Sequence, residues 1–250
     1  MMKAGKDALY RATIDFGNTY GKVGIFYKDE LIKVYSRLTA SDVKNCLQNY
    51  VIEEAIICNV GENKDFLTEE LLTFIPFVMS FNHKTSLPIH NLYTTPHTLG
   101  LDRLAGVMGA KVHFPEDACL VIDMGTCVTF DFIDEHNQYH GGSISPGLSM
   151  RFKALEAFTA RLPLCSTNPE IGLIGNSTEQ SIQSGVYHGL KAEIIGIIQH
   201  YQEKFGKIKV ILCGGDGIYF EKALKPFIFA DYHLIHYGLN RILRTNEKNL

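Results

Sequence analysis

The 250-residue sequence lacks a long apolar run, an excess of basic residues and any CxxC pair of cysteines. No apolar stretch approaches the roughly 20 residues that a membrane-spanning helix needs, and the opening MMKAGKDALYRA lacks the apolar core of a signal peptide. A net charge of −3 with scattered Lys and Arg is unlike the basic surface of a nucleic-acid-binding protein. We therefore expect a cytoplasmic protein that has neither a nucleic acid nor a membrane as a partner.

The six cysteines occur singly, several of them within apolar runs such as AIICNV and VILCGG. This is typical of reduced, buried thiols and favours a reducing compartment.

Several common nucleotide-site and catalytic motifs are also missing. The stretch GNTYGKV superficially suggests a Walker A loop, but the glycine spacing is one residue short and no Ser or Thr follows Lys22. There is no GxGxxG after the first predicted strand and no GxSxG nucleophile motif. His83, His90 and His97 recur at intervals of seven in a polar loop, a spacing that we interpret as coincidence rather than a metal site. A Rossmann cofactor site, a P-loop and a hydrolase elbow are therefore not indicated.

The order of predicted elements is βββαβαβ, and it occurs twice along the chain. In the first half, hydrophobic patterning and turn residues predict strands at 12–15, 22–27, 31–35, 55–59 and 77–81, and helices at 41–50, 64–74 and 101–112. In the second half they predict strands at 118–123, 128–133 and 209–213, a third strand reaching 141–142, and helices at 147–158, 177–204 and 218–224. The pattern predicts two α/β domains, 1–115 and 116–250.

Each predicted domain opens with a strand that ends in Asp-x-Gly. The first turn reads Asp15-Phe16-Gly17-Asn18-Thr19 and the second reads Asp123-Met124-Gly125-Thr126. Glycine lets the backbone approach a phosphate closely, an amide or hydroxyl can donate to it, and an ionised Asp can hold a metal ion. Asp-x-Gly also occurs in ordinary hairpins, but two copies at matching places favour a pair of phosphate-binding turns.

Three further motifs have both a structural and a functional interpretation. Adjacent glycines in LCGGDG (212–217) suit either a tight strand-to-helix turn or contact with a planar nucleoside. Pro146-Gly147 in GGSISPGLSM starts a helix whose N-terminus could face an anion. In TLGLDRLAG, Asp102 either complements a helix dipole or accepts a proton from an attacking hydroxyl, with Arg103 holding an anionic group.

Together these motifs resemble the actin-like ATPase and sugar kinase superfamily, and within it the type III pantothenate kinases. DFGNTYGKVGIF is similar to the family's DxGNTxxKxGxF, LGLDR to its GxDR, DMGTCVTFD to its DxGTAxTxD and GGSISPGL to its GGxIxPG. The resemblance runs from residue 12 to about 240. It implies two duplicated ribonuclease H-like domains with ATP in the cleft between them, and phosphorylation of the primary hydroxyl of pantothenate, the first step of coenzyme A synthesis.

The resemblance also assigns roles to individual positions. The ATP-binding residues would be Asp15, Phe16, Gly17, Asn18, Thr19, Tyr20, Gly21, Lys22 and Thr126. The pantothenate-binding residues would be Tyr93, Gly100, Leu101, Asp102, Arg103 and Thr178.

The resemblance further implies a general base, two kinds of bound ion and a homodimeric protein. Asp102 would be the general base, Asp15 would position Mg²⁺ through water, and Asp123 would be a ligand of K⁺ or NH₄⁺. Cys127 stands where the family usually has alanine, and activity should survive because buried cysteine behaves as a small apolar side chain.

Two alternatives remain open from the sequence. One is a kinase that acts on another small alcohol with the same fold, and the other is a nucleotide-binding regulatory protein without kinase activity. The presence of Asp15, Asp102 and Asp123 favours catalysis, because a degenerate relative is expected to lose its acids first.

Overall fold

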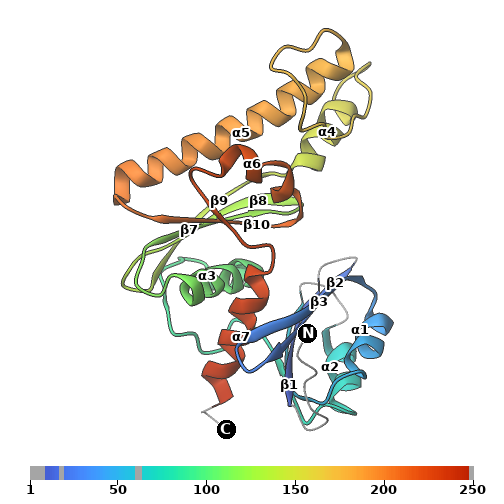
Figure 1. Ribbon diagram of the computed structural model, residues 1–250, viewed down its shortest axis with the longest axis vertical. Coiled ribbons are helices and arrows are strands. Elements are labelled where there is room, and N and C mark those ends of the chain that lie inside the picture. The colour runs from blue at the N-terminus through green and yellow to red at the C-terminus, as the bar shows by residue number, and fades with distance from the viewer. Residues whose placement is uncertain (1–8, 17–19, 60–63, 248–250) are drawn as a thin grey trace. The chain divides into compact units, whose positions relative to one another are not determined.

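The structure is a computed structural model that describes residues 9–16, 20–59 and 64–247 (Figure 1). Its contacts divide the chain into two units. Unit 1 consists of residues 1–113 and 233–250, and unit 2 consists of residues 114–232. The division at 113/114 lies close to the predicted boundary. Residues 233–250, which the sequence analysis assigned to the second domain, instead belong with unit 1, because the last helix packs against elements of that unit.

Unit 1 contains a sheet with the strand order β3-β2-β1-β4-β5. The first three strands form two antiparallel hairpins, and β4 and β5 run parallel to β1. The strands are β1 (Tyr10–Phe16), β2 (Gly21–Tyr27), β3 (Glu30–Leu38), β4 (Ile52–Asn59) and β5 (Phe77–Ser80). A short β6 (His90–Asn91) follows in the chain and is not part of this sheet.

Alternation along β1 separates the two faces of this sheet. Ala12 and Ile14 are fully buried in a core beneath α1 (Ala40–Leu47) and α2 (Lys64–Leu72), whereas Thr13 and Asp15 point to the opposite face. Helix α1 begins after Thr39, whose hydroxyl accepts the N–H of Asp42 in a capping box. The polar residues of β1 therefore lie on a face that α1 and α2 do not cover.

That opposite face is covered by α7 (Leu234–Asn246), and α3 (Leu101–His113) packs against α7 (Figure 1). Glycines make the close approach possible. A Cβ on Gly238 would overlap the carbonyl of Ala105, and one on Gly109 would overlap the carbonyl of Leu234. The sequence analysis expected α3 but assigned no helix to 234–246. A short 3₁₀ turn, η1 (Pro96–Thr98), precedes α3.

Unit 2 repeats the topology of unit 1, with its own strands in the order β9-β8-β7-β10-β11. Again two antiparallel hairpins are followed by two strands parallel to the first. The elements are β7 (Cys119–Met124), β8 (Cys127–Ile133), β9 (Gln138–Pro146), α4 (Leu148–Ala157), α5 (Thr178–Phe205), β10 (Lys209–Cys213), η2 (Gly215–Tyr219), α6 (Glu221–Leu224) and β11 (Phe229–Ala230). The predicted duplication and mixed α/β class are confirmed.

The core of unit 2 lies between its sheet and α5, the 28-residue helix that crosses it (Figure 1). Leu120, Ile122 and Phe130 from the sheet meet Leu190 and Ile194 from the helix. Helix α5 starts after Ser177, whose hydroxyl accepts the N–H of Gln180, and stops at Gly206, where φ is +74°. Across the described part of the chain, no helix is both long and apolar enough to cross a membrane.

Candidate functional site

The end of β1 brings a carboxylate and an ammonium group together. Asp15 lies directly opposite Lys22 on β2, on the sheet face that α7 covers. The pKa of Asp15 is raised to about 6, mainly by burial; the positive charge of Lys22 lowers it and the negative charge of Asp102 raises it. Asp15 and Asp102, which the sequence analysis selected from motifs 87 residues apart, are therefore electrostatically coupled within unit 1.

Asp102 occupies the first turn of α3. Its Oδ1 accepts the backbone N–H of Arg103 at 2.8 Å, which holds the carboxylate at the helix start. Gly100 leaves room for the carboxylate in this position, because a Cβ there would overlap Oδ1 of Asp102. The carboxylate is thus fixed by its own helix, and the helix N-terminus stabilises its negative charge.

Arg103 and Tyr93 form a second part of the site. The Arg103 side chain is buried, and its guanidinium carbon lies 5.7 Å from the centre of the Tyr93 ring, within the range of a cation–π contact. Tyr93 is half-buried, and its N–H is accepted by Oδ1 of Asn91. Leu101 is buried, so it can contribute an apolar wall or a backbone group rather than a polar side chain.

The remaining predicted phosphate residues of unit 1 fall into two groups. Gly17, Asn18 and Thr19 lie outside the described residues. Among their neighbours, Phe16 packs its ring against Gly21, since a Cβ on Gly21 would overlap that ring. Tyr20 is 56% exposed. Phe16 and Gly21 therefore pack against each other where β1 ends and β2 begins, and any contact that they make with ATP would come from the backbone.

Unit 2 places the second Asp-x-Gly turn between β7 and β8. Asp123 is the penultimate residue of β7, as Asp15 is of β1. The N–H of Gly125 is accepted by the carbonyl of Cys127 at 3.0 Å, and the N–H of Gly147 by that of Thr126 at 3.2 Å. The second bond connects the turn to the start of α4. The Thr126 side chain is exposed. The predicted turn and the Pro146-Gly147 helix start are thus adjacent.

The two glycines of LCGGDG have different roles. Gly214 has φ +83°, and a Cβ there would overlap the backbone of Met124 and the carboxylate of Asp123, so packing against β7 requires this glycine. Nothing lies within 4 Å of where a Cβ on Gly215 would be. The structural interpretation holds for Gly214, whereas Gly215 leaves room for a ligand.

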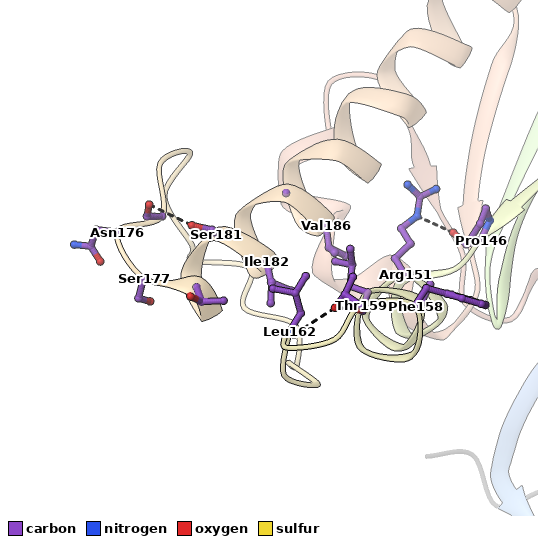
Figure 2. A pocket seen from close by; sticks show the side chains of 15 residues that line it. Pro146, Arg151, Phe158, Thr159, Leu162, Asn176, Ser177, Ser181, Ile182 and Val186 are labelled. Atoms are coloured by element: carbon purple, nitrogen blue, oxygen red, sulfur yellow. Dashed lines mark hydrogen bonds between the residues drawn. The ribbon is translucent and has the colours of Figure 1, made fainter.

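Thr178 is the first residue of α5 in unit 2. It borders a cavity of about 1240 Å³ between α4, the segment 159–177 and the start of α5 (Figure 2). The lining is mainly apolar, and Arg151 at its edge is engaged by Glu193, by Ser145 and by the Pro146 carbonyl. An apolar surface could therefore fill the cavity while the charge of Arg151 stays paired with Glu193.

Within unit 1 the described residues provide two carboxylates, those of Asp15 and Asp102, and two basic side chains, those of Lys22 and Arg103. The sequence model of one family, type III pantothenate kinase, matches residues 12–200. The chain belongs to the type III pantothenate kinase family. Membership of a kinase family implies an ATP-dependent reaction that uses a divalent metal ion.

Close relatives in the type III pantothenate kinase family match almost the whole chain. The protein of that name from Phocaeicola vulgatus is 44% identical over 240 residues, covering 94% of this chain and 98% of its own. The one from Cytophaga hutchinsonii is 46% identical over 237 residues, covering 93% and 98%. The family that the sequence motifs predicted is confirmed.

Solved structures confirm the fold. A conserved Baf-family protein from Campylobacter jejuni, described as a transcriptional activator, aligns with a TM-score of 0.63 at 22% identity and covers 96% of this chain and 100% of its own. Component A of (R)-2-hydroxyglutaryl-CoA dehydratase from Acidaminococcus fermentans has a TM-score of 0.50 at 14% identity, with 96% and 98% covered. At these identities the likeness concerns the architecture alone.

The donor groups fit the ions expected for a type III pantothenate kinase. Among the described residues no group of three or more His, Cys, Asp or Glu side chains could hold a metal ion. Mg²⁺ commonly uses one or two carboxylates together with water and substrate phosphates, and Asp15 offers a buried carboxylate of this kind. In unit 2, the Asp123 carboxylate lies next to the backbone of Gly125 and Gly214, and carboxylate oxygens are ligands that hard cations prefer.

The sequence analysis missed Thr13 and His236. Oγ1 of Thr13 and Nδ1 of His236 lie 2.8 Å apart, both buried on the face of β1 that carries Asp15. Thr13 appears in an ordinary apolar strand, and His236 lies on α7, which was not predicted. An apolar pattern at 234, 239, 242 and 243 could have revealed the helix.

Proposed function

We propose that this protein transfers the γ-phosphoryl group of ATP to the primary hydroxyl of pantothenate, which is the first step of coenzyme A biosynthesis. The observation that carries the proposal is the coupled pair Asp15 and Asp102, within a chain of this family. Asp15 would act at the phosphates of ATP, and Asp102 would act at the hydroxyl of pantothenate.

Asp102 is the general base in this proposal. Because Oδ1 accepts the Arg103 N–H, Oδ2 accepts the hydroxyl proton. The substrate oxygen forms a bond to the γ-phosphorus, the bond to the β,γ-bridging oxygen breaks, and ADP leaves with that electron pair. The transition state is loose, so alignment of the hydroxyl by Asp102 matters as much as proton removal. Arg103 and Tyr93 would orient pantothenate beside Asp102.

The phosphates of ATP would be held by residues 15–22, with Thr126 of unit 2 as a further contact. Asp15 would hold Mg²⁺ through water, and the ion supplies neutralisation of phosphate charge. Lys22 adds a positive charge close to Asp15. Asp123 would hold K⁺ or NH₄⁺, and the segment at Gly215 leaves room for the nucleoside.

A homodimer completes the proposal. Beside the cavity at Thr178, the large apolar side chains of Phe158 and Ile174 are 88% and 87% exposed. Exposed apolar groups gathered at a cavity are typical of an interface, and here a second copy would cover them and place Thr178 near substrate. Sedimentation equilibrium should give a dimer for the parent protein and a monomer for Phe158→Asp with Ile174→Asp. A parent monomer at micromolar concentration would contradict this.

The deciding assay measures ADP release from the purified protein with ATP and Mg²⁺, with and without K⁺. Turnover with pantothenate, but not with glucose or glycerol, supports the proposal. Turnover on another alcohol alone would indicate a different kinase of the same fold. No turnover on any acceptor, with ATP still bound, would indicate a nucleotide-binding regulatory protein.

Cys127 offers a test of where ATP binds. It is half-buried one residue after Thr126, so bound ATP should slow its alkylation by iodoacetamide. Mass spectrometry of the labelled peptides measures the rate, and Cys165, also half-buried but on the segment that follows α4, is the internal control. ATP should protect Cys127 and leave Cys165 unaffected. Equal labelling of Cys127 with and without ATP would remove Thr126 from the ATP site.

A further inference from the structure

His236 is a buried polar residue at the centre of unit 1. It lies on α7 with 2% of its surface exposed, and its Nδ1 is 2.8 Å from Oγ1 of Thr13 on β1. Gly24, opposite Thr13 on β2, allows the ring to approach, since a Cβ there would lie 3.0 Å from the imidazole and closer still to Oγ1 of Thr13. The imidazole thus contacts both strands of the hairpin that ends in the Asp15 turn.

The bond to Thr13 lies next to the end of that hairpin, where Asp15 and Lys22 carry their charges. Thr13 and Asp15 are two residues apart and point to the same face, and their partners across the hairpin are Gly24 and Lys22. Fixing Thr13 against α7 therefore fixes the distance of Asp15 and Lys22 from that helix.

The same helix is fixed to the element that carries the general base. Gly238 of α7 packs against the backbone of Ala105, and Gly109 of α3 packs against the backbone of Leu234. Backbone-to-backbone contacts of this kind leave little freedom for sliding. Helix α7 therefore connects the strand that bears Asp15 to the helix whose first turn bears Asp102.

The electrostatics keep His236 uncharged. Burial lowers its pKa to about 3, and the charges of Lys22 and His233 act in the same direction. Among the described residues, Nε2 of His236 and Oδ1 of Asn240 are buried without a hydrogen-bond partner. Since unsatisfied buried atoms destabilise a fold, stability alone would favour an apolar residue at position 236. The polar ring therefore has another role.

We propose that His236 is a positioning residue for phosphoryl transfer: its bond to Thr13 sets Asp15, through α7, at the correct distance from Asp102. The inference rests on the proposed function and assigns a role to a side chain that would touch neither ATP nor pantothenate. Its signature is a loss in kcat, with little change in KM for pantothenate, because the reacting groups are misaligned rather than released.

The first test changes Thr13. Thr13→Val has the shape of threonine but cannot bond to His236, whereas Thr13→Ser keeps the hydroxyl. We expect kcat to fall about 10- to 100-fold in Thr13→Val, as for small misplacements of reacting groups, and to stay near the parent value in Thr13→Ser. A Thr13→Val protein as active as the parent would overturn the proposal.

The second test changes His236. Asparagine can place a polar atom near the position of Nδ1, so His236→Asn should retain much of the activity that His236→Leu loses. The double variant Thr13→Val with His236→Leu should be no slower than the slower single variant, because both changes remove the bond between Thr13 and His236. Additive losses would overturn the proposal.

A packing control separates positioning from stability. Leu243 is fully buried seven residues further along α7, and Leu243→Ala should lower the melting temperature without a comparable loss in kcat well below that temperature. If Leu243→Ala loses as much kcat as Thr13→Val at equal stability, the role of His236 is structural. An inactive parent protein would instead overturn the proposed function, so the two failures are distinguishable.

Discussion

Asp102→Asn should lower kcat for pantothenate phosphorylation by about 10²–10⁴-fold and leave ATP binding nearly unchanged. The amide is isosteric with the carboxylate, and its oxygen can still accept the Arg103 N–H that now bonds to Oδ1. The helix start and the Gly100 backbone next to it therefore keep their geometry. What the variant lacks is an acceptor for the hydroxyl proton and a negative charge to align the alcohol.

Single-turnover measurements with saturating ATP give this rate directly, and KM for ATP serves as the measure of binding. Asp102→Ala is the matched variant, because it also removes the bond to the Arg103 N–H and should be less stable than Asp102→Asn. If Asp102 served only as a structural cap of α3, Asp102→Ala would be less stable than the parent and Asp102→Asn would remain active. Parent-like kcat in Asp102→Asn would exclude Asp102 as the base.

The duplicated fold could be predicted from sequence because its signals are local. The alternation around Ala12 and Ile14, and the turns after Asp15 and Asp123, lie within a few residues of the elements that they define. The family followed from four short motifs in the correct order. The pairing of Asp15 with Lys22 was also implicit, since a tight turn between two strands fixes their register.

The remaining features depend on contacts between distant segments. Helix α7 returns to unit 1 after more than 100 residues of unit 2, and its sequence does not indicate which sheet it covers. Its bond from His236 to Thr13 spans 223 positions. Gly214 was ambiguous for the same reason, because only the position of Met124 shows that packing requires a glycine there.

Asp15→Asn should abolish most activity and at the same time stabilise the protein at neutral pH. The carboxylate is the proposed Mg²⁺ group, so its loss should lower kcat/KM by about 10²–10³-fold. The stability gain follows from the pKa of Asp15, which burial raises from 3.8 to about 6 in the folded protein. Because the folded protein binds the Asp15 proton more tightly than the unfolded chain does, its free energy of unfolding falls as the pH rises from 3.8 to about 6.

The cost of ionising Asp15 in the fold is therefore absent below about pH 4, grows up to about pH 6, and is complete at pH 7.5. A shift of about two units corresponds to about 3 kcal/mol, which asparagine does not incur. Urea unfolding should show Asp15→Asn to be more stable than the parent at pH 7.5 and similar to it at pH 4. Mg²⁺ with ATP should stabilise the parent more than the variant, because the cation offsets the buried charge. A variant less stable than the parent at pH 7.5 would show that ionising Asp15 does not cost the folded protein stability, and would contradict the raised pKa.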